Sequence, residues 1–217
     1  MTRDTTAPTG TATDPGRRAP AVRVGIAAVW AALVLALLGS LTSFVTVLTG
    51  RVLFASGGAE QRLPLTSLPQ VVQAELQEGY TGFLTDVPLW LRLFCASPLV
   101  VEAVMIAAAG LLVARILRSI GSGDPFGPQV ISALRRVAVV LLAGGFLQGI
   151  LDLAAGRVLW NVSTDFTTVN IFDRYAVLNY AGPQWPWLLI LLGVIAAALA
   201  VAFRQGARLQ EETVGIV

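Results

Sequence analysis

Two acidic residues lie inside stretches that are otherwise apolar, and their side chains could carry protons or bind cations. Glu102 interrupts the apolar run 93–114, and Asp152 lies near the end of the run 137–155. A carboxylate at membrane depth is costly, so it should face other helices and find a polar partner. Gln148 precedes Asp152 by four residues and therefore shares its face of a helix. Glu102, Gln148 and Asp152 form a candidate intramembrane polar site.

This polar site has a functional and a structural interpretation. In the functional one, the carboxylates relay protons or cations or touch a ligand, as in a small transporter or an ion-conducting oligomer. In the structural one, they clasp two helices together, or a neutral Glu102 bonds a neighbour, while Arg92 or Arg157 reaches in from the outer interface. The two other apolar runs carry no charged side chain. Two carboxylates alone make a poor conduction path, which favours the structural interpretation.

A second candidate site is the basic turn between two apolar runs. Glycines end the first helix, Asp-Pro favours a turn, and Gly127 precedes a proline suited to the first position of the next helix. Four arginines and one aspartate give the segment 115–136 a net charge of +3. This segment has two possible roles: it anchors lipid phosphates and sets the topology, or it docks an acidic cytoplasmic partner. The first role is the favoured one. The residues concerned are Arg115, Arg118, Asp124, Pro125, Phe126, Arg135 and Arg136.

The composition places the chain among membrane proteins. Of its 217 residues, 55% are apolar and 13% are charged, and the mean hydropathy is +0.73. A soluble domain carries about 25% charged residues, so this chain has too little polar surface to cover a globule. It has no histidine, and its one cysteine cannot form an internal disulfide. No nucleophile–base set, metal-ligand cluster or phosphate-binding loop is recognisable, so we expect no catalytic residue, metal or cofactor.

Four apolar runs are long enough to cross a bilayer, which takes about 20 residues. We expect an all-α protein with a bundle of four transmembrane helices. A membrane domain at 21–210 follows a disordered cytoplasmic tail at 1–20 and precedes a short tail at 211–217. The predicted spans are 24–48, 93–114, 137–155 and 185–203.

The arginines predict the orientation of the four spans. Ten lie in the N-terminal segment, the basic turn and the C-terminal segment, and five lie in the two other loops. The positive-inside rule therefore predicts that both termini are cytoplasmic and that loops 49–92 and 156–184 are outside. Tryptophans at the starts of the second and fourth runs suit the membrane interface on the outer side.

The two outer loops should form a small extracytoplasmic cap. Ser67 to Gln70 fits a helix-capping pattern and Gly79 a helix stop, which predicts a short surface helix at 67–79. Segments 51–55 and 166–172 have strand-like alternation. Within the third run, Gly145 and Gly149 have the spacing that lets helices approach closely. This spacing could serve a homodimer, but contacts within the bundle are the favoured explanation.

Two stretches resemble a known family. Residues 118–129, with Gly123-Asp124-Pro125-Phe126, precede Leu134-Arg135-Arg136-Val137 and look like the signature of the bacterial domain-of-unknown-function 2975 family. Residues 203–214 are similar to the closing segment of that family, although Gln210 stands where an arginine is usual. The resemblance covers roughly 93–214. It implies a four-span protein of the bacterial inner membrane without an established activity, and a small helix-turn-helix regulator as a cytoplasmic partner.

Together these patterns predict a non-enzymatic sensor or regulatory protein that acts through cytoplasmic partners. The basic turn and the segment from Arg204 onwards would provide the contact surface. We expect the lipid bilayer as its surroundings, homo-oligomers as an option, and no direct binding of nucleic acid, since no DNA-binding module is present. The alternative is the transporter or ion-conducting oligomer that uses Glu102 and Asp152.

Overall fold

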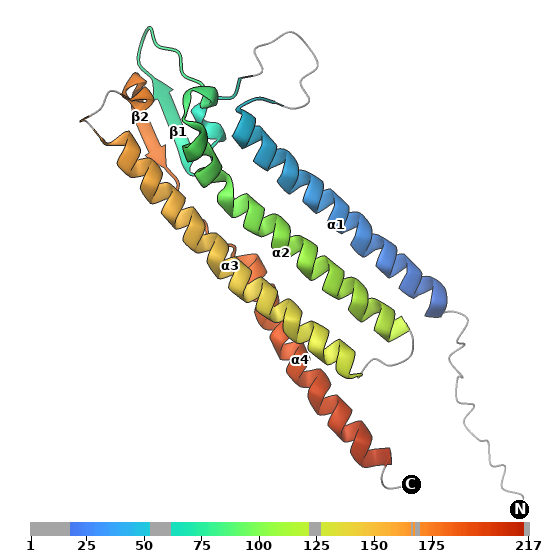
Figure 1. Cartoon of the computed structure of the whole chain (residues 1–217). Coiled ribbons are helices and arrows are strands. Elements are labelled where there is room, and N and C mark those ends of the chain that lie inside the picture. Colours follow the sequence, from blue (N-terminus) through green and yellow to red (C-terminus); the bar gives the residue numbers. More distant parts are fainter. Residues whose placement is uncertain (1–17, 53–61, 122–126, 166, 168–169, 215–217) are drawn as a thin grey trace, which may run out of the picture.

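Four long helices dominate the computed structural model, which describes residues 18–52, 62–121, 127–165, 167 and 170–214 (Figure 1). All four are long and apolar enough to cross a membrane, which confirms the predicted class of a multi-pass membrane protein. The helices are α1 (Arg18–Thr49), α2 (Leu89–Gly121), α3 (Pro128–Ser163) and α4 (Trp187–Val214).

The helices extend beyond the predicted apolar runs. With 36 residues, α3 is about 54 Å long, whereas the hydrocarbon core is about 30 Å thick. Its two ends must therefore project from the bilayer. The helices also extend into the predicted tails at 1–20 and 211–217, because α1 already begins at Arg18 and α4 continues to Val214. Residues 1–17 and 215–217 lie outside the described part of the chain.

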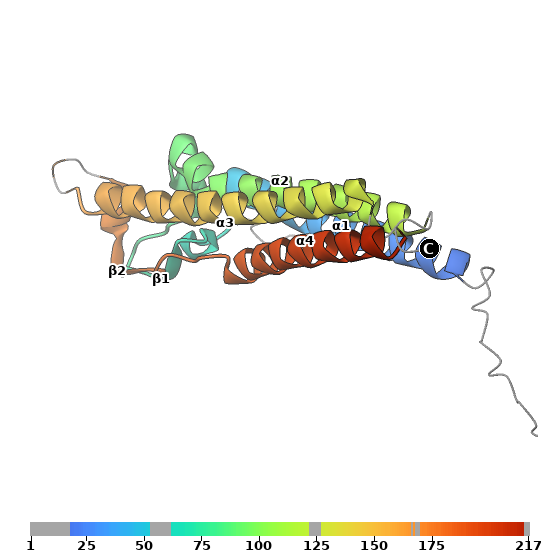
Figure 2. The same ribbon diagram turned by 90° about the horizontal axis from the view of Figure 1, so that it is seen from below.

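Each helix packs chiefly against its neighbours in the sequence. The pair α2 and α3 forms the middle of the assembly, with α1 against α2 and α4 against α3. Figure 2 shows α4 beside the part of α3 that lies away from the cap. An apolar groove of about 520 Å³ lies between α1 and α4 and is lined by side chains from all four helices. The outward faces are apolar, with Leu35 and Leu188 each 70% exposed, as a lipid environment requires.

Glycines on α3 allow its close contact with α4, which confirms the intramolecular interpretation of their spacing. Gly145 and Gly149 are both buried. A Cβ atom added at Gly145 would lie 2.9 Å from Ile190, and one at Gly149 would overlap the ring of Trp185. Trp185 in turn packs edge-on against Phe146, with ring centroids 6.1 Å apart.

A small two-stranded sheet forms the cap at one end of the helices. Strand β1 (Val71–Leu76) pairs with β2 (Tyr175–Tyr180) in antiparallel orientation. The prediction of a surface helix at 67–79 is therefore wrong. The β-branched pair Val71-Val72 favours a strand, and its partner lies in the distant second loop. Gly79, at φ +83°, does provide the predicted stop, but it follows a strand.

The predicted strands at 51–55 and 166–172 do not form as expected where the structure describes them. Arg51 makes only an isolated bridge with Arg62, and residues 53–55 lie outside the described part. The end of the second segment belongs to a short 3-10 helix, Ile171–Arg174, which leads directly into β2. Two further 3-10 helices, Leu65–Ser67 and Leu84–Asp86, flank the first strand.

The cap and the helix ends beneath it share one hydrophobic core. Leu84 from the first loop, Leu91 from α2 and Leu159 from α3 are completely buried, and Phe172 from the second loop is 3% exposed. A second cluster, around Leu141 of α3, joins α2, α3 and α4 further from the cap. The cap is thus an extension of the helical core rather than a separate lobe.

The predicted basic turn has the expected helix boundaries. Helix α2 ends at Gly121, and α3 begins at Pro128 with Gly127 as its N-cap residue. Asp124, Pro125 and Phe126 lie outside the described residues. The start of α1 and the end of α4 lie at the same end of the molecule as this turn, opposite the cap (Figure 1). We call this end the basic end.

Candidate functional site

Glu102 and Gln148 join α2 to α3 inside the membrane-spanning part. Gln148 Nε2 donates to Glu102 Oε2 at 3.5 Å, which is a long hydrogen bond. Both residues are partly buried, and Gln148 Oε1 is buried without a hydrogen-bond partner among the described residues. The pair is a weak polar clasp between two helices, which agrees with the structural interpretation of the sequence.

Asp152 binds the cap instead of joining that clasp. Its Oδ1 accepts from Gln70 Nε2 at 3.0 Å, and its Oδ2 accepts from the backbone amide of Gln184 at 2.9 Å. Gln70 also donates to the carbonyl oxygen of Cys95 on α2 at 3.2 Å. One carboxylate therefore connects α3 to both loops of the cap and, through Gln70, to α2.

Gln70 is the central residue of this contact, and its burial is unusual for a polar side chain. It is 2% exposed and directly precedes β1. Its backbone carbonyl oxygen accepts from Ala181, which continues the pairing of the two loops. Its Oε1 has no hydrogen-bond partner among the described residues. The sequence pattern missed Gln70 because it was assigned to a surface helix.

A cavity of about 360 Å³ lies beside Asp152 at the cap end. Arg157, Trp160 and Tyr180 line it together with Asp152 and Gln70, and Glu102 does not. Trp160 and Tyr180 meet edge-on with centroids 5.4 Å apart. Burial raises the pKa of Tyr180 above its usual value, and the nearby Ser163 offsets part of that rise. Glu102 and Asp152 therefore do not share one polar environment, as a single path for protons or cations would require.

The arginines expected to reach the carboxylates are placed differently. Arg92 donates to the carbonyl oxygen of Leu48 at 2.6 Å and to that of Val87 at 3.1 Å. It caps the end of α1, because the last carbonyl groups of a helix lack partners within the helix. Arg157 lines the cavity near Asp152, but it makes no ion pair within 4 Å among the described side chains.

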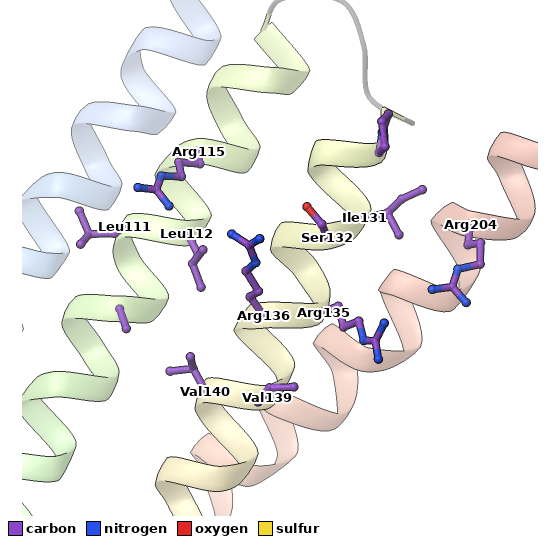
Figure 3. A pocket seen from close by; sticks show the side chains of 12 residues that line it. Leu111, Leu112, Arg115, Ile131, Ser132, Arg135, Arg136, Val139, Val140 and Arg204 are labelled. Carbon is purple, nitrogen blue, oxygen red and sulfur yellow. The ribbon is translucent and has the colours of Figure 1, made fainter.

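At the basic end, a large hollow opens between α2, α3 and α4 (Figure 3). It has a volume of about 880 Å³. Its basic residues are Arg115 of α2, Arg135 and Arg136 of α3, and Arg204 of α4. Arg136 extends from α3 towards α2, and Arg135 extends towards α4 (Figure 3). We call this the arginine hollow; its other lining residues are Ala108, Leu111, Leu112, Pro128, Ile131, Ser132, Val139 and Val140.

No acidic side chain among the described residues balances the charge of the arginine hollow. None of its twelve lining residues is acidic. Among the described side chains, the one ion pair within 4 Å joins Arg174 to Asp86 in the cap. Arg118 lies beside the hollow and lines an adjoining cavity of about 540 Å³ with Arg115 and Arg136. Three of the four arginines predicted as a cytoplasmic surface thus line the hollow, and Arg118 lies next to it.

Potential metal ligands are not clustered in the described part of the chain. No group of three or more histidine, cysteine, aspartate or glutamate side chains there is arranged to hold a metal ion. The single cysteine, Cys95, is fully buried beneath the cap. The described residues offer hydrogen-bonding groups at the cap and guanidinium groups at the basic end.

Comparison with known proteins adds no relative to this description. No protein-family model, no curated protein and no solved structure matches the chain. The resemblance to the domain-of-unknown-function 2975 family therefore stays a prediction, and the assignment that stands is a multi-pass membrane protein with four apolar helices and a two-stranded cap.

Proposed function

We propose that this chain is a non-enzymatic regulatory protein of the bacterial inner membrane that docks an acidic cytoplasmic partner on its basic end. In this proposal both termini are cytoplasmic and the cap is outside. The observation that carries it is the group of exposed arginines on α2, α3 and α4 that have no acidic partner among the described side chains. Guanidinium groups bind carboxylates in a paired geometry, which suits them to such a surface.

The alternative of a transporter ranks second. A proton or cation path would need its carboxylates in one continuous polar environment. Asp152 is bonded to the cap, whereas Glu102 has, among the described residues, only the long bond to Gln148. If transport is nevertheless the function, Glu102→Gln and Asp152→Asn will each abolish a pH-dependent flux in proteoliposomes that the unchanged protein supports.

Docking can be tested by isolating native complexes from membranes. The variant has Arg115, Arg118, Arg135 and Arg136 all changed to glutamine. The control has Arg51 and Arg157 changed to glutamine; both are exposed at the cap end. Specific cytoplasmic proteins should be lost from the first variant and kept by the control at equal membrane levels. If the first variant keeps the same partners, the docking proposal is wrong.

The orientation can be tested by labelling new cysteines, because Cys95 is fully buried. Gly182 in the second outer loop and Gln205 on α4 are both exposed. In intact spheroplasts, a maleimide that cannot cross membranes should label Gly182→Cys but label Gln205→Cys only after permeabilisation. The reverse pattern would place the basic end outside and would exclude a cytoplasmic docking surface.

A further inference from the structure

The arginine hollow combines a polar rim with a deep apolar part. Ala108 lies seven residues before Arg115 on α2, which corresponds to about 10 Å along the helix. On α3 the lining residues run from Pro128 to Val140, a rise of about 18 Å. In Figure 3, Arg115 and Arg136 lie over the upper part of the hollow's wall, and Val139 and Val140 lie lower on α3. The hollow therefore follows the helices into their apolar segments.

This combination defines the chemistry of the occupant. The rim presents guanidinium groups from three helices, and such groups bind phosphate oxygens with two parallel hydrogen bonds. The deeper wall consists of Ala108, Leu111, Val139 and Val140, which offer no polar contact. An occupant must therefore carry negative charge at one end and a hydrocarbon chain at the other. A soluble acidic protein meets only the first requirement, because it has no apolar chain that enters the bilayer.

We propose that the arginine hollow is a binding site for one anionic phospholipid. The phosphate lies between Arg115 and Arg136, Arg135 and Arg204 add positive charge towards α4, and one acyl chain follows Val139 and Val140 on α3. Basic pockets between transmembrane helices are suited to anionic headgroups. This inference does not rest on the proposed docking function, since the lipid site stands whether or not a protein partner also contacts the basic end.

The test is native mass spectrometry of the purified full chain titrated with phosphatidylglycerol or phosphatidylcholine. The unchanged protein should retain one phosphatidylglycerol at least about tenfold more tightly than phosphatidylcholine. Each arginine near an anionic lipid contributes about fivefold, so Arg115→Gln with Arg136→Gln should lower that affinity about 25-fold. The control with Arg51→Gln and Arg157→Gln should bind as the unchanged protein does. Equal retention of both lipids, or unchanged binding by the double variant, overturns the proposal.

A second variant distinguishes a seated lipid from diffuse attraction to charge. Val139→Trp adds bulk to the apolar wall without changing any arginine, and Val139 is 58% exposed, so the helix can accept it. Binding of phosphatidylglycerol should fall although the charge is intact. Glycerophosphoglycerol, which has the headgroup but no acyl chains, should fail to displace the lipid at equal concentration. Unchanged binding by Val139→Trp, or full displacement by the headgroup alone, shows that no chain occupies the hollow.

The lipid and docking proposals fail separately. Loss of protein partners from the four-arginine variant with unchanged lipid binding supports docking and overturns the lipid site. Loss of lipid binding with unchanged partners supports the lipid site and overturns docking. Circular dichroism and gel filtration of each variant should match those of the unchanged protein, and Arg115→Lys with Arg136→Lys, which keeps the charge, should recover part of the affinity.

Discussion

Replacing Gln70 with alanine should destabilise the cap more than replacing any other glutamine or asparagine of the cap loops. The substitution removes two hydrogen bonds, a buried one to the Cys95 carbonyl oxygen and a partly buried one to the Asp152 carboxylate. A neutral hydrogen bond contributes about 1 kcal/mol and one to a charged group about 1.5–3 kcal/mol. Removing Oε1, which has no partner among the described residues, returns about 1 kcal/mol. The expected net loss in the free energy of unfolding is about 2 kcal/mol, roughly a 30-fold change in the equilibrium.

Equilibrium unfolding in mixed micelles, followed by tryptophan fluorescence, measures this loss. Trp160 is a suitable reporter, since its ring contacts Tyr180 of the cap sheet. Gln73→Ala is the matched control. Gln73 lies in β1 and is exposed. It donates to the nearby Glu75 at 2.5 Å and accepts from Asn179 Nδ2 of β2 at 2.9 Å. Because water competes for both of these exposed bonds, their loss should change stability by less than about 0.5 kcal/mol. If the two variants unfold within about 0.5 kcal/mol of each other, Gln70 does not hold the cap as argued.

Two further predictions concern helix packing and pH. Gly149→Ala should lower the free energy of unfolding by about 1–3 kcal/mol, because the added Cβ would overlap the Trp185 ring. Gly156→Ala is the control: it has open space around it, so the change should be neutral or stabilising. Thermal melting compares the two variants, and equal melting temperatures would contradict the close contact. Burial raises the pKa of Tyr175 and Tyr180 above the usual value of 10.0, so folding favours the protonated phenols and stability should fall as pH rises above about 10. Absorbance at 295 nm follows their ionisation, and an unchanged stability at that pH would contradict the prediction.

The helices were predictable from the sequence because each interacts with lipid on its own. Hydropathy over about 20 residues is a local property, and so is the spacing of arginines at the ends of apolar runs. The helix boundary at Gly127 and Pro128 follows from equally local chemistry. These features needed no knowledge of which segments meet in space.

The cap and its hydrogen bonds were not predictable in the same way. Strand β1 takes its conformation from β2, which is distant in the sequence, and local signals at 67–79 equally fit a helix. Gln148 was paired with Asp152 by helical spacing, but its amide reaches Glu102 on the neighbouring helix. Arg92 was expected at a carboxylate, and it caps α1 instead. Partners across elements depend on the tertiary packing, which local patterns do not contain.

The pairing of β1 with β2 also sets an order of events during synthesis. The strands are separated by about 100 residues that include all of α2 and α3. At about 5–20 residues per second, a ribosome needs roughly 5–20 s to make that length of chain. During this interval β1 has been made but has no partner strand, and Asp152 has not yet met the backbone amide of Gln184. Closure of the cap therefore reports that α2, α3 and the loop that follows them have been made and have packed together.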